Sequence, residues 1–259
     1  MDVEAVVVDL DGTIYRGDEA IPGAAEAVEA VRKLGYSVLF VTNNPTRSPT
    51  QYAERLNGFG ISAEPEEILP AGTVTAEYLA MNHYTDDIFM IGSAGLREQF
   101  QAAGIDPVDE PRGADVVVTS HTYGFDYEDL TAGLWALDDA SAFYGTDPDL
   151  VYPDAEGTRY PGSGAITGAV ATVAEREPDL VLGKPSQVMV EHATERLECH
   201  PSACLIVGDG IDTDIAFGKQ AGMETVLVLS GRTTRTELEN GVPRPDHVVE
   251  SIADLPGLL

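Results

Sequence analysis

Two aspartates that follow a short apolar run are the residues of this sequence best suited to do chemistry. Asp9 and Asp11 come directly after the β-branched run Val6–Val8, which is typical of a strand buried in a parallel sheet. Residues two apart on a strand point to the same side, so the sequence predicts a pair of carboxylates here. Gly12 ends the strand, which places the pair at the carboxyl edge where open α/β sheets bind ligands. The alternative is an acidic turn in which Asp11 only caps the next segment.

Further acids follow the apolar run Leu205–Val207. Asp209 stands just past this run, as Asp9 stands past its own, and Asp214 lies one helical turn farther along. From that place Asp214 could orient a metal ligand or its water. A solvent-exposed, aspartate-rich turn is the alternative, because the chain as a whole is acidic.

Polar donors and a lysine follow two other apolar runs. Thr42 and Asn43 come after Ser37–Val41, where Thr42 and neighbouring backbone N–H groups could hold a phosphoryl oxygen. A plain Asn-Pro turn explains the same residues equally well. Lys184, one of three lysines in the chain, follows Leu180–Leu182 and is a candidate cation for a phosphate. The alternative is an ordinary solvated loop lysine.

Short apolar runs alternate with helical patterns along the chain, which predicts a doubly wound parallel α/β sheet. Residues 80–178 carry an alternation of their own, with expected strands at Ile88–Ile91, Val116–Thr119 and Ala142–Tyr144. This segment is long enough to fold as an inserted, smaller α/β domain. The predicted main domain is therefore residues 1–79 and 179–259, and the apolar run before Lys184 counts as one of its strands.

The composition excludes several classes of partner. The chain has 15 basic and 44 acidic residues among 259, a net charge of −29 that repels nucleic acids and anionic membranes. No apolar stretch approaches the ~20 residues of a membrane span and the N-terminus lacks a basic leader, so we expect a cytoplasmic protein. Lysine is rare relative to arginine, which resembles the cytoplasmic proteins of salt-loving archaea.

Two cysteines are too few for a disulfide framework. Cys204 lies within the apolar run Ala203–Val207, which predicts a buried thiol. A zinc site that combines Cys199 and Cys204 with His200 is not favoured.

The ends of four apolar runs carry, in chain order, Asp-Leu-Asp-Gly-Thr, Thr-Asn-Asn, Gly-Lys-Pro and Gly-Asp-Gly-Ile-Asp-Thr-Asp. This order resembles the haloacid dehalogenase (HAD) superfamily over essentially the whole chain, and specifically its phosphatases with a large type-2 cap between the second and third motifs. The NagD-type, p-nitrophenylphosphatase-like and phosphoglycolate phosphatase-like branch is most similar, through residues 15–17, 42–48 and 161–164. Gly210 departs from this branch, many members of which carry arginine at that position.

The resemblance implies a Mg²⁺-dependent phosphomonoester hydrolase. Asp9 would be the nucleophile that forms an aspartyl-phosphate, and Asp11 would be the general acid and base. Asp9, the main-chain carbonyl of Asp11, and Asp209 would hold the metal, with Asp214 behind them.

The resemblance also implies how the substrate is held. Lys184 would offset the charge of the phosphate, while Thr42 and Asn43 would orient the phosphoryl oxygens. The inserted domain would be a lid that chooses the leaving group. The substrate would be a small phosphorylated metabolite such as a sugar phosphate, a nucleotide or phosphoglycolate. Caps of this type can form dimer contacts, so we also consider a homo-oligomer.

Three other activities use part of the same pattern. A phosphotransferase or phosphomutase also passes through an aspartyl-phosphate, and only acceptor assays separate it from a hydrolase. A haloacid dehalogenase would use the first aspartate on carbon and needs neither Asp11 nor a metal-binding acid cluster. A non-enzymatic phospho-receiver also places an aspartate, a Ser/Thr and a lysine at strand ends, but it has no use for a large inserted domain.

Overall fold

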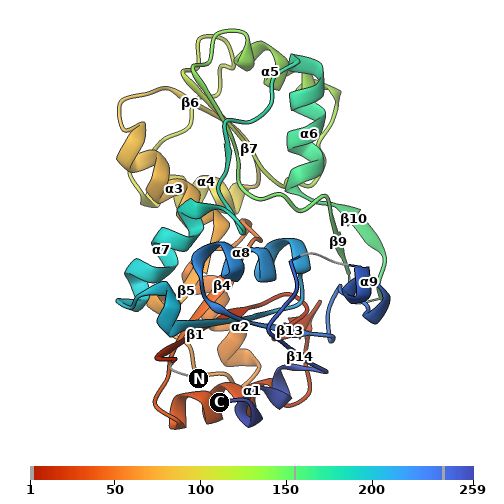
Figure 1. Cartoon of the computed structure of the whole chain (residues 1–259). Coiled ribbons are helices and arrows are strands. Elements are labelled where there is room, and N and C mark those ends of the chain that lie inside the picture. The colour runs from red at the N-terminus through yellow and green to blue at the C-terminus, as the bar shows by residue number, and fades with distance from the viewer. Residues whose placement is uncertain (1–2, 155, 241–242) are drawn as a thin grey trace. The chain divides into compact units, whose positions relative to one another are not determined.

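The computed structural model describes residues 3–154, 156–240 and 243–259, which form two compact α/β units (Figure 1). Unit 1 comprises Met1–Thr42, Pro49–Leu69 and Lys184–Leu259, and unit 2 comprises Asn43–Ser48 and Pro70–Gly183. Each unit has its own sheet. The predicted fold class, a doubly wound parallel sheet with a smaller inserted α/β domain, is confirmed.

Unit 1 is built on a six-stranded sheet in the order β14-β13-β12-β1-β4-β5. The strands are β1 (Ala5–Asp9), β4 (Ser37–Thr42), β5 (Ile68–Pro70), β12 (Cys204–Gly208), β13 (Glu224–Val228) and β14 (His247–Val249). The central strand β1 pairs in parallel with both β4 and β12. The carboxyl ends of these three strands therefore meet at one edge, which carries Asp9, Thr42 and Asp209 to the same place.

Helices cover both faces of this sheet. The α-helices of unit 1 are α1 (Ala24–Lys33), α2 (Pro49–Gly58), α7 (Gln187–Leu197), α8 (Ala216–Ala221) and α9 (Arg235–Asn240). The short helical turns are η1 (Pro65–Glu67), η2 (Pro201–Ala203), η3 (Ile211–Ile215) and η4 (Ile252–Gly257), and a small hairpin joins β2 (Tyr15–Arg16) to β3 (Glu19–Ala20).

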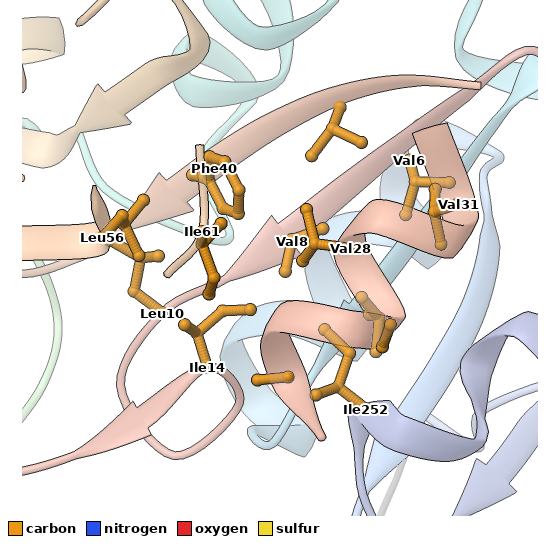
Figure 2. Close-up of a cluster of buried hydrophobic side chains, with 14 of the residues drawn as sticks. Val6, Val8, Leu10, Ile14, Val28, Val31, Phe40, Leu56, Ile61 and Ile252 are labelled. Atoms are coloured by element: carbon orange, nitrogen blue, oxygen red, sulfur yellow. The ribbon is translucent and has the colours of Figure 1, made fainter. Parts of the chain in front are cut away.

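Successive side chains of a strand point to opposite faces of the sheet, so neighbouring residues pack against different helices. Val6 and Val8 point to one face, where they join Val28 and Val31 of α1 in the main apolar cluster (Figure 2). On the other face, the side chain of Ile206 in β12 lies against Gly218 of α8, where an added Cβ would meet it at 2.5 Å. The run Val6–Val8 is thus apolar throughout because both of its faces are buried, as the sequence predicts.

Unit 2 contains a four-stranded sheet in the order β11-β8-β7-β6, with all neighbouring strands parallel. Its strands are β6 (Ile88–Ile91), β7 (Val116–Thr119), β8 (Ala142–Gly145) and β11 (Leu180–Val181), and a separate hairpin pairs β9 (Val151–Pro153) with β10 (Arg159–Pro161). Its helices are α3 (Ala71–Asn82), α4 (Ala94–Ala102), α5 (Tyr127–Leu137) and α6 (Ser163–Ala174). With 12 residues each, α3 and α6 are the longest of the described helices, none of which is long and apolar enough to cross a membrane.

The run Leu180–Leu182 differs from its predicted place in the first sheet. Its strand β11 pairs with β8 of unit 2, with Leu180 opposite Tyr144 and Val181 opposite Gly145. The side chain of Asp179 fixes this register by accepting a hydrogen bond from the backbone N–H of Phe143 at 2.7 Å. The contacts divide the chain at 42/43, 48/49, 69/70 and 183/184, and the boundaries at 79/80 and 178/179 stay a prediction from the sequence.

Candidate active site

Three aspartates from separate elements of unit 1 form a buried acidic cluster. Asp9 ends β1, Asp209 directly follows β12, and Asp214 lies in η3. One carboxylate oxygen from each residue lies within 4.8 Å of the others, and all three side chains are buried. The sequence singles out each of these residues at a strand end or one helical turn beyond it, and the parallel sheet brings them together.

Lys184 connects two of these carboxylates. Its Nζ lies 2.6 Å from Oδ1 of Asp9 and 2.7 Å from Oδ1 of Asp214, and it also donates to the Val41 carbonyl at 3.2 Å. The side chain is only 2% exposed. Lys184 is therefore not a solvated loop lysine, which was the alternative left open by the sequence.

Burial dominates the electrostatics of the cluster. It raises the pKa of Asp9 well above the ordinary value, while the Lys184 ammonium lowers that pKa and the other two carboxylates raise it again. Burial and the Asp214 carboxylate raise the pKa of Asp209 to about 7, although the hydrogen bond from the backbone N–H of Arg232 lowers it. Although burial alone lowers the pKa of Lys184, Asp214 and Asp9 together raise it above its ordinary value. Lys184 is thus held as a cation, and the carboxylates need positive charge beside them.

Asp11 occupies a different environment from Asp9. The strand ends at Asp9, and a tight turn follows in which the backbone N–H groups of Thr13, Ile14 and Tyr15 donate to the Leu10 carbonyl. The period-two argument consequently does not extend to Asp11, whose side chain is exposed. Oδ2 of Asp11 accepts a hydrogen bond from the hydroxyl of Tyr15 at 3.3 Å. The carboxylate of Asp11 is therefore exposed and bonded to the buried Tyr15, while the carboxylate of Asp9 is buried in the acidic cluster.

Thr42 and Asn43 fall on opposite sides of the division between the units. Thr42 is the last residue of β4, one position beyond the Val41 that pairs with Asp9, and it is buried. Asn43 belongs to unit 2, where its side-chain amide donates to Oδ2 of Asp149 at 3.2 Å. The joint action of Thr42 and Asn43 on one phosphate stays a prediction.

A loop that the sequence analysis passes over encloses Asp209. After β13, the backbone N–H of Arg232 donates to Oδ2 of Asp209 at 2.6 Å, and the hydroxyl of Thr233 donates to the Asp209 carbonyl. Gly231 makes this approach feasible, because an added Cβ would lie 1.8 Å from the same carboxylate oxygen. The sequence shows that a Ser-Gly-Arg-Thr segment comes shortly after the apolar strand β13, as Asp-Gly follows β12, but the contact with Asp209 is visible only in the fold.

Arg232 also explains the glycine at position 210. A Cβ on Gly210 would lie 2.4 Å from Nη2 of Arg232 and 2.2 Å from Oγ1 of Thr213. The Arg232 guanidinium uses this space to donate to Thr213 Oγ1 at 2.8 Å and to pair with Asp212. The Asp209 loop therefore has an arginine packed against it, although position 210 itself is glycine.

The cluster suits a divalent cation. Three buried carboxylates converge within a few ångströms, and the single ammonium of Lys184 balances only part of their charge. Isolated buried anions are strongly unfavourable unless they are paired or coordinate a metal. Asp9, Asp209 and Asp214 are the residues that could hold such an ion.

Comparisons with known proteins agree with this geometry. A family model described as haloacid dehalogenase-like hydrolase matches residues 6–106, and a second, described as HAD-hydrolase-like, matches residues 181–255. The sugar-phosphatase AraL of Bacillus subtilis is 34% identical over 96% of this chain and 91% of its own length. The 5'-nucleotidase YutF of the same organism is 34% identical over 96% of this chain and 95% of its own.

Solved structures extend the similarity to the whole fold. The p-nitrophenyl phosphatase from Archaeoglobus fulgidus matches with a TM-score of 0.92 and 36% identity, covering 100% of both chains. NagD from E. coli K-12 matches with a TM-score of 0.87 and 26% identity over 98% of both chains. This chain belongs to the haloacid dehalogenase-like hydrolases, in a branch whose relatives are phosphatases and nucleotidases.

Proposed function

We propose that this chain is a Mg²⁺-dependent phosphomonoester hydrolase that works through an aspartyl-phosphate on a small phosphorylated metabolite. The observation that carries the proposal is the pairing of Asp9 with Lys184 at 2.6 Å inside a cluster of three buried carboxylates. The names of the relatives, a sugar-phosphatase, a 5'-nucleotidase and a p-nitrophenyl phosphatase, support phosphate monoesters as the substrate class.

Asp9 is the proposed nucleophile. Its Oδ1 faces the Lys184 ammonium and its Oδ2 accepts a hydrogen bond from the Thr13 hydroxyl at 3.0 Å, so both oxygens are fixed in direction. An oriented carboxylate can attack phosphorus and divide one difficult displacement into two easier ones. Lys184 favours the ionised form of Asp9 against the effect of burial, and it offsets part of the charge that the phosphate brings.

Asp11 is the proposed proton carrier. Its exposed carboxylate, oriented by the Tyr15 hydroxyl, would protonate the departing alkoxide and then take a proton from the water that hydrolyses the intermediate. Thr42, with Asn43 as its predicted partner, would orient the phosphoryl oxygens.

Asp9, Asp209 and the main-chain carbonyl of Asp11 are the proposed metal ligands. The resemblance implies that Asp214 supports these ligands without binding the metal itself. Its carboxylate lies close enough to those of Asp9 and Asp209 to act as a further ligand. Bound there, Mg²⁺ would neutralise the repulsion between the anionic nucleophile and the anionic substrate. Unit 2 would contribute the contacts that select the leaving group, and the cytoplasmic location stays a prediction.

The test is a set of asparagine substitutions assayed on a panel of phosphomonoesters in Mg²⁺ and high salt. Asp9→Asn should abolish turnover. Asp11→Asn should slow hydrolysis of the intermediate by roughly 10²–10⁴-fold, so that phospho-enzyme can be trapped with an activated substrate, whose leaving group departs without a proton. Asp212→Asn, the same change on an exposed acid of the same loop as Asp209, is the matched control and should stay active. Near-native turnover by Asp9→Asn would refute the mechanism, and transfer of phosphate to added alcohols in preference to water would indicate a phosphotransferase.

A further inference from the structure

The two cysteines of the chain lie against each other. Cys199 follows α7 and is partly exposed, whereas Cys204 is the first residue of β12 and is buried. Their Sγ atoms are 2.7 Å apart. Non-bonded heavy atoms in good contact normally stay roughly 3.5–4.0 Å apart, and a disulfide bond measures about 2.05 Å. Two free thiols therefore stand closer than ordinary contact, with only a small approach left before a bond forms.

The surrounding backbone holds the two sulfurs in this position. Cys204 is fixed by the parallel pairing of β12 with β1, where it stands opposite Ala5. Between the cysteines lie His200 and the three-residue turn η2, which is closed by a hydrogen bond from the Ala203 N–H to the His200 carbonyl at 2.8 Å. The contact between the two sulfurs therefore follows from a short turn, and forming a bond between them requires no larger movement of unit 1.

A metal does not explain this arrangement. Nδ1 of His200 lies 2.8 Å from the Ser202 hydroxyl and accepts the Ser202 N–H at 3.3 Å, so the ring is turned into its own loop. Within the described residues, the group with metal-ligand spacing is the aspartate cluster alone.

We propose that Cys199 and Cys204 are an oxidisable dithiol, a site that takes up an intramolecular disulfide by exchange with a small-molecule disulfide. In the first step the Cys199 thiolate attacks one sulfur of the small disulfide and releases one thiol, which leaves a mixed disulfide on Cys199. In the second step Cys204 gives up its proton and attacks the Cys199 sulfur, and the second small thiol departs. Two protein thiols are oxidised and one small disulfide is reduced to two thiols.

The order of the steps follows from exposure. Cys199 can be reached from solvent, while burial and the neighbouring Cys199 raise the pKa of the Cys204 thiol well above its usual range. Cys204 reacts only with the sulfur that already lies against it. The product would link the end of α7 to the beginning of β12, at the opposite end of that strand from Asp209. Oxidation should therefore change stability and leave phosphatase turnover unaltered.

The experiment exposes the full-length protein to oxidised glutathione and measures intact mass, followed by alkylation under denaturing conditions. The wild-type protein should lose two hydrogens, retain no glutathione and take up no alkylating reagent. Cys204→Ala should stop at the mixed disulfide and gain one glutathionyl group. Cys199→Ser should gain no glutathione, because Cys204 is buried, and should take up one alkylating group after denaturation. Oxidised wild-type protein should also melt several degrees above the reduced form, a difference that both variants lack.

Two results would overturn the proposal. One is wild-type protein in which both thiols are still alkylated after oxidation, and the other is stable glutathionylation of wild-type Cys199, which would show that Cys204 cannot resolve it. Because the readout is mass, Cys199→Ser remains informative even if Cys204→Ala folds poorly. Neither result depends on whether the chain is a phosphatase.

Discussion

The three lysines of the chain form a graded series for measuring what the buried ion pair contributes to stability. Lys33 and Lys219 each pair with one carboxylate and Lys184 pairs with two, and the pairs differ strongly in exposure. The Lys33–Glu29 side chains are 70% and 65% exposed, those of Lys219–Asp246 are 32% and 33%, and Lys184 is 2% exposed beside carboxylates at 8% and 2%. Replacing each lysine by methionine keeps the aliphatic volume and removes the charge.

The expected losses follow from that burial. An exposed i,i+4 pair contributes about 0.3–0.5 kcal/mol and a partly exposed pair about 0.2–1 kcal/mol, so Lys33→Met and Lys219→Met should hardly change the free energy of unfolding. Lys184→Met leaves Asp9 and Asp214 buried without their shared ammonium, which should cost about 3–5 kcal/mol. For a chain of this size about 1 kcal/mol shifts the melting temperature by roughly 2–4 °C, which predicts a fall of roughly 6–20 °C.

The assay is thermal unfolding followed by circular dichroism and calorimetry, in EDTA so that no divalent cation replaces the missing charge. Calorimetry is needed because the two units can unfold separately, and the loss should fall on the transition of unit 1. If the free energy of unfolding of Lys184→Met lies within about 1 kcal/mol of the values for the two controls, the buried carboxylates do not depend on Lys184 and the electrostatic account of the site is wrong.

Three further predictions concern other parts of the molecule. Burial and the Asp149 carboxylate raise the pKa of Asp147 from 3.8 to about 8, so its stabilising contribution is complete below pH 4 and is lost as the pH rises through 8. Asp147→Asn should flatten that fall in pH-dependent melts, and an unchanged slope would contradict it. Gly210→Ala should destabilise the Asp209 loop less in an Arg232→Ala background, with a coupling of about 0.5–3 kcal/mol in a double-mutant cycle; strict additivity would show that the two positions do not compete for space. Finally, the melting temperature should rise with KCl at fixed Mg²⁺, because the screening length falls from about 10 Å at 0.1 M salt to about 3 Å at 1 M and the surface charges then repel one another less. A flat or falling midpoint would refute salt adaptation.

The local sequence pattern predicts the elements of this fold well where an element has a clear capping residue or a continuous apolar run. An aspartate before a helical pattern is a local signal for a helix start. The helix at Tyr127–Leu137 begins in this way, with the Asp126 carboxylate accepting the backbone N–H of Glu128 at 2.7 Å. The strand at Val116–Thr119 is a continuous buried run in both prediction and structure. In these cases the signals lie within the segment itself, so the sequence alone contains them.

Pattern does not predict which sheet a short strand joins. Leu180–Val181 has two residues, and its place beside β8 depends on the Asp179 side chain reaching Phe143, a contact between residues 36 apart in the sequence. Asn43 is a similar case, because it follows Thr42 directly and yet bonds to Asp149 in unit 2. Arg232 was missed for the same reason, since only the fold shows that its loop reaches Asp209. Residues at strand ends can be found from sequence, whereas the partners that orient them come from non-local contacts.

The acidity of this chain has two physical parts that respond to different ions. Most of the 44 acidic residues contribute to a net charge of −29, and exposed charges farther apart than the screening length are relieved by any salt. Asp9, Asp209 and Asp214 are buried, and screening by bulk salt reaches buried groups much less. Their repulsion is met locally by Lys184, and on the proposed function it would be met further by a Mg²⁺ ion in direct contact. KCl should therefore stabilise wild-type and Lys184→Met protein by similar amounts, while Mg²⁺ should recover a larger share of the loss in Lys184→Met than in either control.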